Sequence, residues 1–497
     1  MGETPPQAVF LDEEASPCRQ TRRPPFHHKY KELLMNKNLT TSVATVVTVI
    51  ALITFAALAP GPFQALLTTI KVKVIGHFGF LFTYPAFLAS LIFIGLALSP
   101  LGRLRFGSEP PEFSTLAWLG MLFATGMGIG LVTWGVLEPR YHVEAGLDRD
   151  QALLHAFNHW GLLAWAGYLA IGVIFAHALY NMRLDKPAES LLGGGVMSKL
   201  NLVSLVVSTV IGLSLTFSYA AEPLQKSAAQ YLGLDVSTTW VIVVLSLFAI
   251  VSSASGLKRG IKWLSNYNAL IALILMAATF LLTAPLDILG TFARLLPDYV
   301  LQYPALALDI GFNDPERKAW LADWLYAFEA AWYGWFIFTG VFIARISKGR
   351  TLRQLVLGVM LVPSLVSCLW FTTFGIGGLS TGAEDVFALM ATLDEHGILS
   401  AILALNILLF FVTSADSAGL VCEMLTVQRS RAFWIVAMAA LAVVINWLDG
   451  DIFKVILTLI SVAAIPVAFG IFALVTAFLL RLRQQRATPA TIAPADP

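Results

Sequence analysis

Residues 115–137 read TLAWLGMLFATGMGIGLVTWGVL, an apolar stretch with three glycines within five residues. A helix that crosses a hydrocarbon core of about 30 Å needs about 20 apolar residues, so this stretch is long enough to span a membrane. Each glycine weakens a helix by roughly 1 kcal/mol relative to alanine. Non-helical backbone is tolerated at this depth only where it lines a cavity or is buried in protein. We therefore predict a broken membrane helix whose carbonyl groups at residues 126–130 bind a cation or a substrate. The alternative is a packing face of small residues.

Similar apolar stretches recur along the whole chain. Of the 497 residues, 57% are hydrophobic and 13% are charged, whereas soluble chains carry about a quarter charged residues. Lipid offers no partner to backbone N–H and C=O groups, so such stretches must cross the membrane as helices. The sequence therefore predicts an all-α polytopic membrane protein. About twelve transmembrane helices are expected, near residues 39–59, 79–99, 115–137, 154–180, 201–231, 237–255, 267–285, 322–344, 355–377, 398–423, 433–448 and 454–480.

Charge and cysteine content exclude several other classes. The net charge of +1 gives no attraction to nucleic acid, so no nucleic-acid partner is expected. The three cysteines lie far apart, without the spacing of a disulfide framework or a metal site. Residues 1–38 are polar, which is typical of a tail and not of a signal peptide. Basic residues are more frequent in the loops that would lie on the same side as this tail. We therefore expect a multi-pass protein of the bacterial cell inner membrane with both termini in the cytoplasm.

A second interrupted stretch, FFVTSADS, lies at residues 410–417. Its hydroxyl groups and its carboxylate are costly in lipid and usually mark a pathway for polar solutes. Thr413 and Ser414 offer the hard oxygen ligands that a small cation requires. Asp416 either belongs to that pathway or caps or pairs with a nearby group.

Aromatic residues gather in two of the predicted helices. Residues 159–168 read HWGLLAWAGY, which places Trp160, Trp165 and Tyr168 on neighbouring parts of one helix surface. Residues 332–335 read WYGW. A single tryptophan is typical of the membrane interface, but clusters away from the helix ends are not. Because a quaternary ammonium group has no N–H donor, aromatic faces are the usual way to bind it.

Taken together, these motifs resemble the betaine/choline/carnitine transporter family. The resemblance runs along most of the chain, over residues 40–480, and no single motif would suffice for it. Five motifs in the order typical of the family carry it: residues 126–130 (GMGIG) with Glu138-Pro139, 159–161 (HWG) with Trp165 and Tyr168, 255–265 (SGLKRGIKWLS), 344–350 (ARISKGR) and 412–417 (VTSADS).

The resemblance implies a fold, an assembly and an activity. The fold is a leucine-transporter-like core of two inverted five-helix repeats preceded by two extra helices, and the assembly is a homotrimer in membrane lipid. The activity is secondary active uptake of a small quaternary-ammonium solute of the choline, glycine betaine or carnitine type. It would be coupled to sodium by alternating access and would need no other cofactor. A proton-coupled symporter, or an exchanger for a related amine or amino-acid derivative, remains the alternative. A channel or a membrane enzyme is less favoured.

The resemblance also divides the chain into segments. These are a cytoplasmic tail (1–38), two additional helices with a linker (39–114), the first repeat (115–285), a periplasmic linker (286–321), the second repeat (322–482) and a short C-terminal tail (483–497).

Residue by residue, the resemblance places two sites on this chain. The aromatic substrate box falls on Trp160, Trp165, Tyr168 and Trp332, with Trp335 and Met127 beside it. The sodium site falls on the carbonyls of Ala124, Met127 and Phe410 and on the hydroxyls of Thr413 and Ser414. Leu213 stands where a second hydroxyl can complete another sodium site in the family, so only one sodium site is expected.

Glu329 is the main departure from the family pattern, because it places a carboxylate where an aromatic residue is common. An ionisable residue within a span costs roughly 2.5–3.5 kcal/mol at its centre. Glu329 lies three residues before Trp332, so we expect both on the helix face toward the substrate. It could pair with Lys226, supply a negative charge beside the substrate's ammonium group, or carry a coupling proton.

Overall fold

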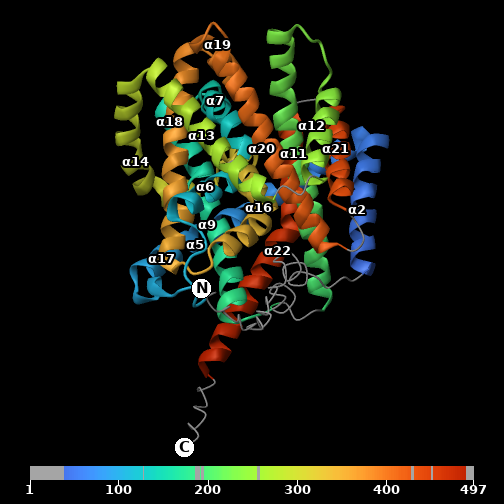
Figure 1. The fold of residues 1–497 in the computed structure, drawn as a ribbon, viewed down its shortest axis with the longest axis vertical. Helices are drawn as coiled ribbons and strands as arrows, with labels where there is room; N and C mark the ends of the chain where they lie inside the picture. Colours follow the sequence, from blue (N-terminus) through green and yellow to red (C-terminus); the bar gives the residue numbers. More distant parts are fainter. Residues whose placement is uncertain are drawn as a thin grey trace, which may run out of the picture.

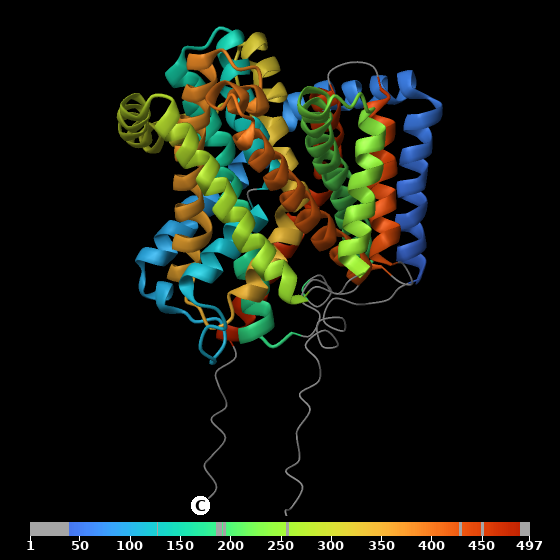
Figure 2. The same ribbon diagram turned by 45° about the horizontal axis from the view of Figure 1, so that its top comes forward.

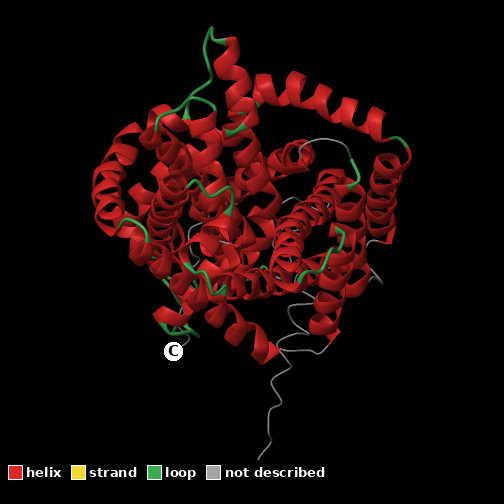
Figure 3. Ribbon diagram, turned by 90° about the horizontal axis from the view of Figure 1, so that it is seen from above, coloured by secondary structure: helices red, strands yellow, loops and turns green. Residues whose placement is uncertain are grey.

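The structure is a computed structural model that describes residues 39–126, 128–184, 191, 195–254, 258–426, 430–448 and 452–487. Helices account for most of the described residues, and the only β pairing among them is an isolated bridge between Arg105 and Thr351 (Figure 3). The all-α prediction is therefore confirmed for this part of the chain. The motif at residues 255–257, the tail predicted at 1–38 and residues 488–497 of the tail predicted at 483–497 lie outside the described residues. Residues 483–487 continue helix α22.

The helices follow one another along the chain in the order shown in Figure 1. Their bounds are α2 Leu39–Leu58, α3 Pro60–Ile70, η1 Lys71–Ile75, α4 Gly76–Phe78, α5 Phe80–Leu98, η2 Pro100–Arg103, α6 Thr115–Gly126, α7 Gly128–Glu144, α8 Arg149–Trp160, α9 Leu162–Ala176, η3 His177–Asn181, α11 Val196–Leu232, α12 Thr238–Ala254, α13 Lys258–Leu282, α14 Pro285–Ala307, α15 Pro315–Asp323, α16 Leu325–Ile346, α17 Leu352–Leu355, η4 Val356–Leu361, α18 Val362–Thr381, α19 Val386–Leu393, α20 Ile398–Leu425, α21 Arg431–Asn446 and α22 Ile452–Ala487.

Many of these helices are suited to a membrane. Eight helical segments of the described chain are long and apolar enough to cross it, and a ninth results if α13 and α14, which meet at an angle of 110°, form one span. Helices α12 and α21 are apolar but shorter. Each of the apolar stretches predicted from the sequence coincides with a helix or with a run of two or three consecutive helices.

Two of the predicted spans are interrupted in the middle. Helix α6 ends at Gly126 and α7 begins at Gly128, whose φ of 20° departs from the helical value, and the residue between them lies outside the described residues. The second break separates α8 from α9 at Gly161, whose φ is −103° and ψ −129°. A Cβ at Gly161 would contact the Phe157 carbonyl and would lie 2.9 Å from the Tyr299 hydroxyl, so a side chain does not fit there. The helix is therefore interrupted at Gly161, although α8 and α9 together still form one candidate span.

Helices α9 and α16 form the tightest described contact at the centre of the molecule. A Cβ on Gly167 would overlap the ring of Phe336, and a Cβ on Gly340 would overlap the side chain of Ile171. Small residues of this kind let membrane helices approach closely. Helices α5 and α22 pack against the same pair. The glycines thus fix the position of the two helices that carry most of the predicted aromatic box.

A second group of helices stands to one side of this centre. Helices α2, α12 and α21 lie side by side at the edge of the molecule, with α11 between them and the centre (Figure 2). Helix α14 lies on the opposite edge. The start of α2 and the end of α22 lie at the same, lower end of the molecule (Figure 1).

Candidate functional site

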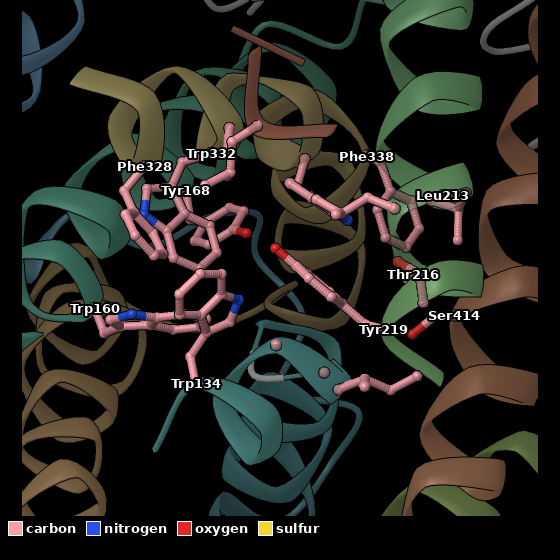
Figure 4. Close-up of a pocket in the computed structure, with 17 residues that line it drawn as sticks. Trp134, Trp160, Tyr168, Leu213, Thr216, Tyr219, Phe328, Trp332, Phe338 and Ser414 are labelled. Carbon is pink, nitrogen blue, oxygen red and sulfur yellow. The ribbon is translucent and has the colours of Figure 1, made fainter. Parts of the chain in front are cut away.

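A cavity lies where the two broken spans meet α11, α16 and α20. Figure 4 shows the rings of Trp134, Trp160, Tyr168, Phe328 and Trp332 gathered on one side of it. The side chains of Leu213, Thr216 and Ser414 lie on the other side, together with the ring of Phe338. The residues that line it are Gly128, Ile129, Gly130, Trp134, Trp160, Tyr168, Leu213, Leu215, Thr216, Tyr219, Phe328, Ala331, Trp332, Trp335, Phe338, Ser414 and Leu457.

Most of the predicted aromatic box surrounds this cavity. The rings of Trp160 and Trp332 meet edge to face, with centroids 5.0 Å apart and planes at 84°. The ring of Tyr168 lies 6.1 Å from that of Trp332, and Trp335 lies 6.2 Å from it on the other side. Trp165 contacts Tyr168 at 5.4 Å but does not line the cavity. Four of the five predicted aromatic residues are therefore brought together, and Trp165 supports one of them from behind.

Four further aromatic residues line the cavity and were not predicted: Trp134, Tyr219, Phe328 and Phe338. The ring of Trp134 lies 5.1 Å from that of Phe328 and 6.1 Å from that of Tyr219. Trp134 follows Gly130 by four residues, and Phe328 precedes Trp332 by four, and residues four apart share a helix face. This spacing could have revealed both residues. Nothing in the sequence places Tyr219, which comes to the cavity through the packing of α11.

The predicted sodium ligands lie partly at the cavity wall. Ser414 on α20 and Gly128 at the start of α7 face the same space. The Thr413 hydroxyl donates to the carbonyl oxygens of Leu409 and Phe410, both at 3.0 Å. Ala124 lies near the end of α6, and Met127 lies outside the described residues. Ser414 is thus the one predicted sodium ligand among the described residues that lines the cavity, and the Thr413 hydroxyl is bonded within α20.

Asp416 pairs with a nearby residue, which is one of the two roles that the sequence left open for it. Its carboxylate lies 3.2 Å from a guanidinium nitrogen of Arg431, which also bonds Glu423 at 2.8 Å. This arrangement ties the lower half of α20 to the start of α21.

Glu329 lies away from the cavity, so its expected position on the substrate face is wrong. The residues of α16 that line the cavity are Phe328, Ala331, Trp332, Trp335 and Phe338. Glu329 is fully buried, and neither carboxylate oxygen has a hydrogen-bond partner among the described residues.

The predicted pairing of Glu329 with Lys226 is also wrong. The Lys226 ammonium instead lies 3.1 Å from Glu222 and 3.8 Å from Asp385.

Comparison with known proteins identifies the family of the chain. Residues 40–487 match the betaine/carnitine/choline family of transporters. The chain belongs to this family. Its multiple apolar helices therefore belong to a multi-pass membrane transporter, and the resemblance seen in the sequence motifs is confirmed.

Relatives of this chain include transporters named for glycine betaine and for ectoine. The glycine betaine transporter OpuD of Bacillus subtilis is 28% identical over 88% of this chain and 93% of its own length. Glycine betaine transporter 1 of Vibrio parahaemolyticus is 31% identical over 84% and 88%, respectively. The ectoine/hydroxyectoine transporter of Virgibacillus pantothenticus is 31% identical over 80% and 87%.

Proposed function

We propose that this family member takes up a small quaternary-ammonium solute by secondary active transport. The chemistry of the cavity wall supports this proposal, because none of the described residues that line the cavity carries a charge. A trimethylammonium group has no N–H donor and binds to aromatic faces. A primary amine would instead need an acceptor for each N–H group. The wall therefore suits a zwitterion such as glycine betaine.

Uptake into proteoliposomes that contain the purified protein tests this proposal. Radiolabelled glycine betaine should accumulate inside, since two of the relatives are named for this solute. Excess unlabelled choline, carnitine and ectoine should then rank the competing substrates, with glycine as the unmethylated control. Equal competition by glycine, or no accumulation of any methylated solute, would reject a quaternary-ammonium substrate.

The arrangement of helices supports a twelve-span topology as part of this proposal. The pairs α6–α7 and α8–α9 each form one span, as do α15–α16 and the run from α17 to α18. Helix α13 then spans alone, because α14 turns away from it by 110°. With α2, α5, α11, α12, α20, α21 and α22, this gives two extra helices followed by two five-helix repeats, 115–285 and 322–482, joined by a periplasmic linker at 286–321.

The cellular setting is proposed on the same grounds. The start of α2 and the end of α22 lie at one end of the molecule, as a cytoplasmic location of both termini requires. A bacterial inner membrane and a homotrimer complete the proposal. Cysteine labelling from each side of right-side-out vesicles tests the orientation, and cross-linking in membranes tests the trimer.

Sodium coupling gives a specific prediction. Removing one hydroxyl ligand in Ser414→Ala should raise the sodium concentration for half-maximal uptake by about tenfold, as expected from the loss of about 1.4 kcal/mol. In the unmodified protein, uptake should follow a hyperbola in sodium, because one site is expected. Uptake measured as a function of sodium concentration at constant ionic strength gives both the half-maximal concentration and the shape of the curve. Ser204→Ala is the matched control, since the Ser204 hydroxyl is exposed and donates to the Leu200 carbonyl. Full uptake in potassium alone would contradict sodium coupling.

Proton coupling or exchange is the second candidate. Two observations favour it: Leu213 presents an apolar side chain to the cavity where a further cation ligand could stand, and Glu329 is buried without a hydrogen-bond partner among the described residues. Uptake that persists without sodium but collapses with a protonophore would select this candidate.

A further inference from the structure

Glu138 is a buried carboxylate that the proposed function does not yet use. It lies on α7 beside Pro139, and its side chain is fully buried. A buried carboxylate is costly and is retained where it has partners. Its role is therefore defined by the groups that contact its two oxygens.

Each oxygen of Glu138 contacts a residue at the end of α8. Oε2 accepts a hydrogen bond of 2.6 Å from the indole N–H of Trp160. Oε1 lies 2.6 Å from Nδ1 of His159, a distance at which the imidazole N–H donates to the carboxylate. Hydrogen bonds to an ionised acceptor are short and strong. The carboxylate therefore fixes two consecutive side chains just before the break at Gly161.

Trp332, the other tryptophan of the contacting pair, is connected to the same group of residues. The indole N–H of Trp332 donates to the backbone carbonyl of His159 at 2.9 Å. The imidazole ring of His159 also stacks on Phe328, another residue of the cavity wall, with centroids 5.0 Å apart and planes 7° apart. The indole N–H groups of Trp160 and Trp332 thus end on Glu138 or on the residue that Glu138 holds.

From this geometry we infer that Glu138 is the positioning residue of the substrate box. It orients Trp160 directly and Trp332 through His159, so that the two rings present their faces to an ammonium group at the same time. This inference rests on the proposed function for its ligand. The hydrogen bond between the Glu138 carboxylate and the Trp160 indole is present without any ligand.

Other titratable groups surround the pair of Glu138 and His159. Nε2 of His142 lies 3.5 Å from Oε1 of Glu138, and the ring of His155 lies 5.8 Å from that of His142. Ligand atoms of Glu138, His142 and His159 lie within 4.8 Å of one another, a spacing that a metal ion could also use. Both oxygens of Glu138 are already occupied by short hydrogen bonds, which favours the positioning role.

A double-mutant cycle between Glu138 and Trp160 tests the inference. Glu138→Gln keeps the shape but removes the charge and one of the two acceptor oxygens, so the dissociation constant for glycine betaine should rise about tenfold. Trp160→Phe keeps an aromatic face but has no N–H, and should also weaken binding. If Glu138 acts through that N–H, the double variant should bind no more weakly than the weaker single variant. Isothermal titration of purified protein in EDTA measures all four constants.

Glu144→Gln is the matched control, because Glu144 is an exposed residue of the same helix that pairs with Arg140 at 2.6 Å. Its dissociation constant should equal that of the unmodified protein. Losses that multiply in the double variant, or an unchanged constant in Glu138→Gln, would overturn the inference.

A measurement without ligand separates this inference from the proposed function. Glu138→Gln should alter the near-ultraviolet circular dichroism of the tryptophans. This difference should become smaller in the Trp160→Phe background, where Glu138 acts only on Trp332 through His159. If the unmodified protein binds no ammonium solute, the proposed function fails, while the spectra still decide whether Glu138 holds Trp160. A difference of unchanged size in the Trp160→Phe background would overturn the positioning role.

Discussion

Replacing Trp332 by leucine is expected to raise the dissociation constant for the ammonium substrate by roughly 10- to 100-fold. The substitution removes an aromatic face, which contributes about 0.5–2 kcal/mol to cation binding. It also removes the hydrogen bond from the indole to His159, which contributes about 0.5–1.5 kcal/mol and aligns the ring with Trp160. Isothermal titration of purified protein measures the constant. Trp332→Phe should recover part of the loss, because it restores a ring but not the N–H.

Two further variants make this result specific to the cavity. Trp240→Leu makes the same change at an exposed position of α12 and should leave the affinity unchanged. Trp165→Leu should have a smaller effect than Trp332→Leu, because Trp165 contacts Tyr168 from behind and does not line the cavity. Equal losses for Trp165→Leu and Trp332→Leu would mean that packing, and not contact with the ligand, determines the affinity.

Glu329→Met is expected to stabilise the protein and to impair transport. A buried polar group without a hydrogen-bond partner costs about 1–3 kcal/mol, and both oxygens of Glu329 lack one among the described residues. Methionine has a similar length and no such cost, so the melting temperature should rise. An ionisable residue at this depth is retained for a role in transport, so the uptake rate should fall by about tenfold or more. Melting in detergent and uptake into proteoliposomes measure the two effects.

The affinity of the substrate distinguishes the roles that remain for Glu329. Because Glu329 does not line the cavity, the dissociation constant should stay unchanged in Glu329→Met and in Glu329→Gln. A proton carrier would in addition lose the dependence of uptake on pH in both variants. A higher dissociation constant in these variants would instead support a role for Glu329 as a counter-ion. Normal uptake together with an unchanged melting temperature would show that Glu329 has no role.

The sequence predicts the helices well because their apolar stretches are a local property. The breaks at residues 126–130 and at Gly161 have local signals as well, since both contain glycine. The helical breaks and the aromatic motifs were therefore sufficient to locate most of the cavity wall.

The position of Glu329 shows where local information ends. Residues three apart on a helix point about 60° apart, which is close enough to suggest a common face. The packing of α16 against α9 and α5 nevertheless places Trp332 at the cavity and leaves Glu329 buried away from it. The rotation of a helix about its own axis is set by its neighbours, and so is the arrival of Tyr219 from α11. Neither can be deduced from spacing along one helix.

The glycine contacts between α9 and α16 have a mechanical consequence. Where the side chains of one helix enter gaps in the backbone of the other, as Phe336 does at Gly167 and Ile171 does at Gly340, sliding would create steric overlap. We therefore expect α9 and α16 to move together as one rigid body during transport. Tyr168 and Trp332 would then keep their spacing through the cycle. Other helices must then separate to admit the solute. We expect these to be α7 and α11, which are joined by the contact between Trp134 and Tyr219.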